Sequence, residues 1–211
     1  MRNRFIGPLE LVSAIVPETD ESEMTGDYVR GYIDLYLTTL GKEFQQGDAP
    51  GNVVDNSRIE PSLSWSSGCI IASMEDLARW IHAVGSGELL NDEYQNMLEN
   101  DHISIFNADF GMGWGLGFMQ VTSLDYLGHT GQLTGYDTGL TYNKTRHYAI
   151  AVGVNRQLYG YGFGDYKNMN TVFIYGMTNY LNGNDNDPSD FDQIVTPRSK
   201  NFLTDPLPYM W

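Results

Sequence analysis

The residues that could carry chemistry are few, and they gather around one histidine. Histidine is the side chain whose ordinary pKa lies nearest to neutral pH, which suits it to proton transfer. Of the four histidines, none stands in the His-Glu-x-x-His pattern of a zinc site. Only His129 lies in a run of small polar residues, the His-Thr-Gly-Gln of residues 129–132. We take residues 129–136 as the candidate site. The alternative is a strand-end histidine that makes one structural hydrogen bond.

Other reactive patterns are missing from the sequence. It contains no Gly-x-x-x-x-Gly-Lys-Ser/Thr phosphate loop and no Gly-x-Ser-x-Gly nucleophile elbow. The single Cys69 excludes an internal disulfide and a zinc site built from several thiolates. The acidic residues 185–192 lack the spacing of a calcium-binding loop and are interpreted as a solvated tail. We therefore predict no metal and no cofactor.

Composition narrows the possible partners. The chain has 211 residues, enough for one sizeable core or two small ones. Its 27 acidic and 12 basic residues give a net charge of -15, which argues against binding to nucleic acid or anionic bilayers. No apolar run reaches the length of about eighteen residues that a membrane helix needs. The basic start at residues 1–4 is not followed by the apolar segment of a signal peptide.

Helices are predicted on both sides of the candidate site. The apolar spacing over residues 73–84 predicts a helix with Ser73 as its N-cap. A second helix should begin after Asn91, with three residues facing inward, namely Tyr94, Met97 and Leu98. Residues 170–181 should form a third, with one apolar side made of Phe173, Met177, Tyr180 and Leu181. Residues 1–68 read as loops with one short helix near residues 29–40.

The candidate site should lie on a sheet. Apolar residues alternate with glycine over residues 110–118, which indicates a strand against which something packs closely. The Trp114 in this segment is interpreted as core or cleft wall. Further strands are predicted at residues 124–130, 137–142 and 147–154, the last two forming a hairpin closed by residues 143–146. Because residues 149–154 are almost wholly apolar, we expect a central strand covered on both faces. Residues 160–164 read as a glycine-rich loop.

Several short segments follow one another in a characteristic order. Residues 67–80 lead from Ser-Gly-Cys into the Ser-Met-Glu-Asp-Leu-Ala of the first predicted helix, and residues 129–131 form the His-Thr-Gly box. Residues 7–11 read Gly-Pro-Leu-Glu-Leu, with glutamate where glycine is usual, and residues 30–32 read Arg-Gly-Tyr. Together they resemble the C-terminal part of the serine β-lactamase and penicillin-binding protein superfamily. The nearest branch is the class C-like group of D-Ala-D-Ala carboxypeptidases, D-aminopeptidases and esterases.

The resemblance implies an α+β fold, an antiparallel sheet flanked by helices, and a serine hydrolase that cleaves amide or ester bonds through an acyl-enzyme. In such enzymes the box strand lies beside the bound acyl group. The resemblance implies that His129 keeps the site electropositive or relays a proton. Thr130 would offer a hydroxyl to the substrate, and Gly131 would let the substrate backbone approach. The backbone N–H of Gln132 would supply half of an oxyanion hole. The residues assigned to substrate and oxyanion binding are Gln132, Gly135 and Tyr136.

Two elements of the family's chemistry are not found in their expected places. The family nucleophile belongs to Ser-x-x-Lys, and no serine here is followed three positions later by lysine. The nearest matches begin at Thr39 and Thr141. Tyr-x-Asn occurs at residues 94–96 and 166–168, at the wrong places in the order. The sequence therefore predicts a truncated or partial domain without the N-terminal part of the fold, inactive on its own.

Three functions remain open on this evidence. The chain is the C-terminal portion of a serine hydrolase, a non-catalytic domain that binds a peptide or partner chain, or a structural fragment. We expect residues 1–72 to be a remnant of the helical and loop lobe, 73–182 the helix and sheet portion, and 183–211 an acidic, then proline-rich, tail. Expected partners are a small-molecule or peptide substrate and the missing N-terminal half or a second copy. The resemblance suits a secreted or periplasmic protein, but the sequence leaves the compartment open.

Overall fold

The computed structural model describes residues 1–18, 24, 26–34, 53–58, 61–104, 112–133, 135–157 and 169–183. The helical turns are η1 (Arg2–Ile6), η3 (Pro61–Ser67) and η4 (Thr122–Leu124), and the helices are α1 (Met74–Gly85), α2 (Asp92–Asn100) and α3 (Met169–Leu181). The strands are β1 (Tyr32–Asp34), β2 (Val53–Asp55), β3 (Ile103–Ser104), β4 (Met112–Gly115), β5 (Phe118–Val121), β6 (Tyr126–Leu133), β7 (Tyr136–Asn143), β8 (Tyr148–Val154) and β9 (Arg156–Gln157).

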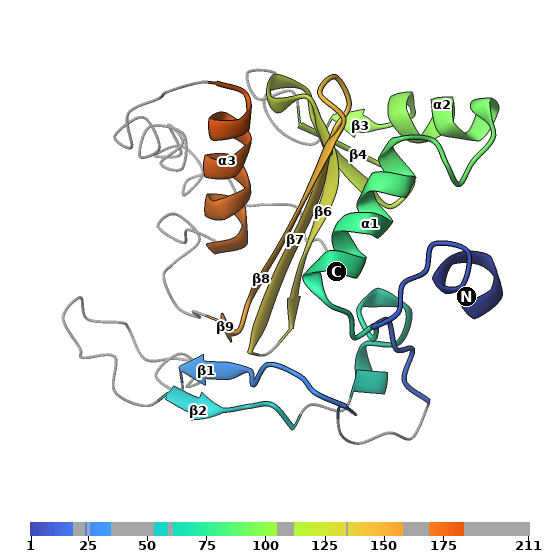
Figure 1. Cartoon of the computed structure of the whole chain (residues 1–211). Coiled ribbons are helices and arrows are strands. Elements are labelled where there is room, and N and C mark those ends of the chain that lie inside the picture. The colour runs from blue at the N-terminus through green and yellow to red at the C-terminus, as the bar shows by residue number, and fades with distance from the viewer. Residues whose placement is uncertain are drawn as a thin grey trace.

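The centre of the molecule is an antiparallel sheet in the order β3-β4-β5-β6-β7-β8. The β6, β7 and β8 strands form a meander of consecutive hairpins, paired from Tyr126↔Asn143 to Leu133↔Tyr136 and from Asn143↔Tyr148 to Asp137↔Val154. Figure 1 shows α1 and α3 on opposite faces of this sheet. The predicted α+β class and the antiparallel sheet flanked by helices are confirmed.

The predicted first helix is confirmed as α1, and its start follows simple capping rules. The Ser73 hydroxyl accepts a hydrogen bond from the Asp76 backbone N–H at 3.2 Å. Glu75 and Asp76 place negative charge in the first turn, where the helix dipole favours it. Ile81 and Val84, on the predicted apolar face, are buried.

Close contacts fix α1 against the sheet. A Cβ at Gly85 would come within 2.2 Å of the ring of Tyr142, and one at Gly153 would come within 2.9 Å of the Met74 side chain. Tyr142 and Gly153 therefore lie on the face of β7 and β8 that α1 covers. A small buried cluster of Val84, Leu98 and Leu127 joins α1 and α2 to β6.

A buried carboxylate joins α1 to the N-terminal segment. The Asp76 carboxylate accepts hydrogen bonds from the Ser13 backbone N–H at 2.7 Å and from its hydroxyl at 2.6 Å. The side chain of Asp76 is only 4% exposed, so these bonds replace water that the carboxylate has lost. Nearby, Ile15 and Ile71 exchange backbone hydrogen bonds in an isolated bridge.

The second helix, α2, begins as predicted, but one of the three side chains predicted to face the core faces solvent. Asn91 caps it, because its side chain accepts a hydrogen bond from the Tyr94 backbone N–H at 2.9 Å. Leu98 is buried as expected and Met97 is half-buried. The inward orientation predicted for Tyr94 is wrong, since this side chain is 56% exposed.

The third helix, α3, has the predicted extent but presents the predicted apolar side to solvent. Among its described side chains Ile174, Thr178 and Asn179 are buried, and the Tyr148 hydroxyl of β8 donates to Asn182 at the end of the helix. The exposed residues are Phe173, Met177, Tyr180 and Leu181, between 42% and 81% exposed. Periodicity alone could not choose between these faces, because α3 contains no charged residue to mark a solvent side.

Two strand predictions and one helix prediction need correction. Residues 112–118 form two strands joined by a tight turn, in which Leu116 and Gly117 both have positive φ. Residues 32–34, predicted near the start of a short helix, form β1 because they pair with β2 and β9. The β8 strand was expected to be central and covered on both faces. It is contacted by α1 and α3 on its two faces, but it is the last strand of the sheet among the described residues.

The predicted loop at residues 160–164 and the tail from residue 184 lie outside the described residues.

A second, small sheet has the order β2-β1-β9. Its β1 strand is antiparallel to β2 and parallel to β9, which follows β8 directly. Figure 1 places this sheet beneath the lower end of β6, β7 and β8. Within the described part of the chain, no helix is long and apolar enough to cross a membrane.

Candidate functional site

The box lies on β6, where one edge of the strand becomes free. The β5 strand pairs with β6 from Val121↔Tyr126 to Met119↔Gly128 and no further. On the other side β7 stays paired with β6 as far as Leu133. Among the described strands, none pairs with residues 129–133 on the β5 side. Backbone N–H and C=O groups of the box therefore face an open edge, which is a template for an extended ligand.

His129 stands at the point where β5 leaves β6. Its ring is half-buried and meets the ring of Trp114 from β4 edge to face, with centroids 4.9 Å apart and planes at 80°. Its Nδ1 atom lies 2.5 Å from the backbone carbonyl oxygen of Thr130. Because a carbonyl oxygen can only accept, Nδ1 carries a proton in this contact. In the neutral ring, Nε2 then holds the free lone pair.

Gly131 and Gln132 are the exposed part of the box, and Thr130 before them is half-buried. A Cβ built on Gly131 would meet nothing within 4 Å, and the residue has no positive φ. In contrast, a Cβ on Gly128 of the same strand would come closer than 3.0 Å to the backbone oxygen of Leu140. The fold thus requires the glycine at position 128, whereas the space beside Gly131 is open for another molecule.

Next to the box lies a buried carboxylate. Asp137 of β7 is paired with Gln132 across the hairpin and is 1% exposed. Burial raises the pKa of Asp137, while a hydrogen bond with the Gln132 side chain acts in the opposite direction. The Gln132 side chain is thereby engaged with β7.

Gly135 and Tyr136, predicted for substrate or oxyanion binding, contact the N-terminal segment. The Tyr136 hydroxyl donates a 2.8 Å hydrogen bond to the carbonyl of Val29. Its ring lies over Gly31, where a Cβ would come closer than 3.0 Å to it. Gly135 has φ +95° and lies against the backbone of Gly31 and Tyr32. The structure thus brings the turn after the box together with the Arg-Gly-Tyr segment.

A polar network holds this segment in place. The Ser57 hydroxyl accepts from the Gly31 N–H at 3.0 Å and donates to Asp55 at 2.5 Å. Arg30 donates to the other Asp55 oxygen at 2.6 Å. Hydrogen bonds from Ser57 first, and from Arg30 second, lower the pKa of Asp55 to about 2.

The near matches to the missing elements do not supply them. Thr141 is 2% exposed within β7, between Gly128 and Ile150 of the neighbouring strands, so its hydroxyl cannot attack a substrate. Tyr94 lies on the exposed side of α2 and not on the box strand. The matches at residues 39–42 and 166–168 lie outside the described residues.

One residue beside the site was missed by sequence reasoning. Trp114 was interpreted as core or cleft wall, and its contact with His129 depends on the turn that folds β4 back along β5. The positive φ of the Leu116-Gly117 pair makes that turn, and no periodicity signals it. The glycine that follows leucine was the available clue, since glycine suits such a turn.

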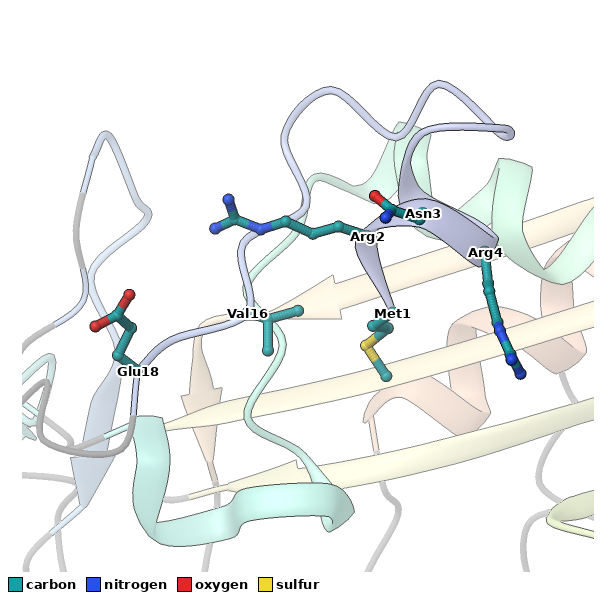
Figure 2. Close-up of a pocket in the computed structure, with 6 residues that line it drawn as sticks. All are labelled: Met1, Arg2, Asn3, Arg4, Val16 and Glu18. Carbon is teal, nitrogen blue, oxygen red and sulfur yellow. The ribbon is translucent and has the colours of Figure 1, made fainter.

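A surface hollow elsewhere does not coincide with the box. Its volume is about 700 Å³, and Figure 2 shows its lining from the N-terminal turn and the segment after it. The lining residues are Met1, Arg2, Asn3, Arg4, Val16 and Glu18. In the described part of the chain, no group of three His, Cys, Asp or Glu side chains could hold a metal ion.

Known structures share the fold of this chain over part of their length. A D-stereospecific amidohydrolase from Streptomyces sp. matches with a TM-score of 0.59 and 24% identity, over 74% of this chain and 42% of that one. The D-amino acid amidase from Ochrobactrum anthropi SV3, solved with L-phenylalanine, matches with a TM-score of 0.63 and 15% identity, over 86% of this chain and 49% of that one. The present chain thus spans less than half the length of either structure.

These likenesses establish the fold as β-lactamase-like. The sequence profile of the Beta-lactamase family matches residues 9–171, which include the last three residues of the first landmark segment, all of the second, α1 and the box. The fold and the order of these segments therefore agree, and the chain belongs to the Beta-lactamase family.

Proposed function

We propose that this chain is the C-terminal portion of a class C-like serine hydrolase that acts on amide or ester bonds through an acyl-enzyme. The observation that carries the proposal is the His-Thr-Gly box on an open strand edge, with free space beside Gly131. An extended acyl group can pair with such an edge through backbone hydrogen bonds. The two amidases that share the fold support an amide as substrate class.

The parts of the box would have distinct roles. The backbone N–H of Gln132 would stabilise the negative charge on the carbonyl oxygen as the tetrahedral intermediate forms. His129 would exchange a proton with the reacting groups or supply positive charge when protonated. The Thr130 hydroxyl would bind the carboxylate or carbonyl of the substrate. These roles raise the rate only when an activated nucleophile attacks the same carbonyl.

The nucleophile would come from another polypeptide segment that carries Ser-x-x-Lys and Tyr-x-Asn. This segment would correspond to the part of each solved structure that the match leaves uncovered, since the match covers 42% of one and 49% of the other. Such a segment would cover two surfaces, the exposed apolar side of α3 and the outer edge of β8, with which no other described strand of the sheet pairs. We accordingly expect no turnover from the 211-residue chain alone.

The first experiment tests the chain alone. The purified protein is incubated with nitrocefin, p-nitrophenyl acetate and a fluorescent fluorophosphonate, and adducts are sought by intact mass. We expect no hydrolysis above background and no adduct. Stoichiometric labelling of a serine would show that the chain has its own nucleophile, and would refute the need for a second segment.

The second experiment supplies the nucleophile. The chain is co-expressed with the part of the Streptomyces amidohydrolase that the match leaves uncovered, and hydrolysis of a D-amino acid amide is measured. In an active pair, His129→Ala should lower turnover by about 10²–10³. His147→Ala is the matched control, because His147 lies in the β7–β8 turn and contacts the Tyr142 hydroxyl at 2.9 Å. Equal losses in both variants would place the site elsewhere.

A second function rests on the same open edge. A domain that binds peptides without cleaving them would add the peptide to β6 as a further strand. Titration of the ¹⁵N-labelled chain with a short N-acylated peptide would then shift the amide signals of residues 129–132. Shifts at the box without turnover in the co-expressed pair would favour this binding function over hydrolysis.

A further inference from the structure

The contact between Trp114 and His129 suggests a role for the glycine-rich segment that the proposed function does not use. Residues 113–117 alternate glycine with Trp114 and Leu116. Glycine inside a strand weakens it unless another backbone or side chain approaches closely. The structure supplies that close neighbour.

The neighbour is the chain that leaves α2. A Cβ on Gly115 would come closer than 3.0 Å to the backbone of Asp101 and His102, and one on Gly113 would collide with the His102 ring. The β3 strand, which begins at the next residue, pairs with β4 through Ile103↔Trp114 and Ser104↔Gly113. Trp114 is therefore held by a partner strand on each side, since Met119 of β5 pairs with it as well.

The Trp114 ring is also supported by packing. It lies against the cluster of Met119, Val121 and Tyr126, whose side chains are all buried. A half-buried indole fixed in this way meets the His129 ring at 80°, an edge-to-face geometry that aromatic pairs favour. The contact lies where β5 stops pairing with β6, so among the described strands only β7, through Leu140, pairs with His129.

We propose that Trp114 is a positioning residue that holds His129 with Nδ1–H donating to the Thr130 carbonyl, so that Nε2 is the atom that exchanges protons at the site. The 2.5 Å contact fixes which nitrogen carries the proton in the neutral ring. Of the two roles open to His129, this arrangement favours proton relay over fixed positive charge. The proposal deepens the proposed function and concerns the same site.

The test observes the tautomer of His129 directly and needs no turnover. The ¹⁵N-labelled full chain is studied by two-bond ¹H–¹⁵N correlation at about pH 8, above the ordinary pKa of histidine, and a His129→Gln variant assigns the signals. We expect the Nδ1–H tautomer in the wild-type protein. Free histidine prefers the Nε2–H tautomer. If the wild-type protein shows the Nε2–H tautomer at His129, this result alone overturns the proposal.

Two substitutions separate positioning from general stability. Trp114→Leu should convert His129 largely to the Nε2–H tautomer, whereas Trp114→Phe, which keeps an aromatic ring, should preserve the wild-type signals. Trp80→Leu is the matched control, because Trp80 makes a similar edge-to-face pair, with Phe5 instead of His129. A wild-type tautomer in Trp114→Leu, or the same change in Trp80→Leu, would contradict the positioning role.

The result is independent of the hydrolase proposal. If the co-expressed pair shows no turnover while His129 keeps the Nδ1–H tautomer through Trp114, the hydrolase fails and the positioning inference stands. If turnover appears, Trp114→Leu should lower kcat with KM nearly unchanged and displace the pH profile, and Trp114→Phe should restore both. Turnover that is insensitive to Trp114→Leu would refute the link to catalysis.

Discussion

The hydroxyl of Tyr136 donates a 2.8 Å hydrogen bond to the backbone carbonyl of Val29, although the two residues are 107 positions apart. Tyr136 begins β7, directly after the turn that follows the box. Val29 precedes the Arg-Gly-Tyr segment, whose Gly31 lies under the Tyr136 ring. The contact therefore joins the N-terminal landmark of the family to the turn beside the candidate site, and gives the glycine of that landmark a physical reason.

Removal of this contact should destabilise the fold in two graded steps. Tyr136→Phe deletes one hydrogen bond and should cost about 1 kcal/mol of unfolding free energy. Gly31→Ala forces a methyl group into the Tyr136 ring and should cost about 1–3 kcal/mol. Urea denaturation measures both, with Tyr94→Phe on the exposed side of α2 as the neutral control. If Gly31→Ala leaves the free energy of unfolding unchanged, the contact with the Tyr136 ring does not hold the segment in place.

The two glycines of the box strand should respond in opposite ways to alanine. Gly131→Ala should leave stability unchanged or slightly higher, since its Cβ meets nothing within 4 Å and alanine restricts the unfolded chain. Gly128→Ala should be strongly destabilising, because its Cβ would overlap the backbone of Leu140. In the co-expressed pair, Gly131→Ala should nevertheless lower activity by blocking the ligand. A fully active, stable Gly131→Ala protein would remove substrate approach as the reason for this glycine.

Acid should weaken the hydrogen bonds that the Asp55 carboxylate of β2 accepts from Ser57 and from Arg30, which precedes β1. The pKa of Asp55 is lowered from 3.8 to about 2, so its contribution to stability is present above about pH 4 and is lost as the pH falls through about 2. Asp55→Asn should therefore flatten the acid limb of the stability curve in this window. Carboxyl titration by NMR gives the pKa itself. Ser57→Ala should raise it more than Arg30→Gln does, because the hydrogen bond from the Ser57 hydroxyl lowers this pKa more than the one from Arg30, although the backbone N–H of residue 57 still donates in the alanine variant.

Association should reveal the uncovered surfaces of the isolated chain. The outer side of α3 exposes four large apolar residues, and the outer edge of β8 is free among the described strands. Neither α3 nor β8 contains a charged residue, so two copies can meet there despite a net charge of -15 on each chain. We expect sedimentation of a dimer or larger species at micromolar concentration, and Met177→Glu should shift it toward monomer. A compact wild-type monomer with a cooperative melt would contradict this expectation.

Local rules in the sequence were sufficient for α1 and for the meander of β6, β7 and β8. A serine cap with two acidic residues and an apolar repeat determines a helix wherever it packs. A four-residue polar turn between apolar segments likewise determines a hairpin, because its strands are neighbours in the chain. The order of the landmark segments could also be seen in the sequence, and this order predicted the family.

Tertiary structure decided the features that depend on distant partners. Tyr32 lies in a strand because it pairs with Arg156, which is far away in the sequence. Nothing in residues 29–34 predicts this pairing. The buried side of α3 is set by β7 and β8, since apolar residues on every side of the helix leave its orientation undetermined by sequence. Trp114 reaches His129 only because β4 turns back along β5 and β5 then departs from β6. Hydrophobic periodicity is a property of adjacent residues, whereas strand pairing and ring contacts depend on the whole chain, and this difference separates what the sequence determined from what the fold decided.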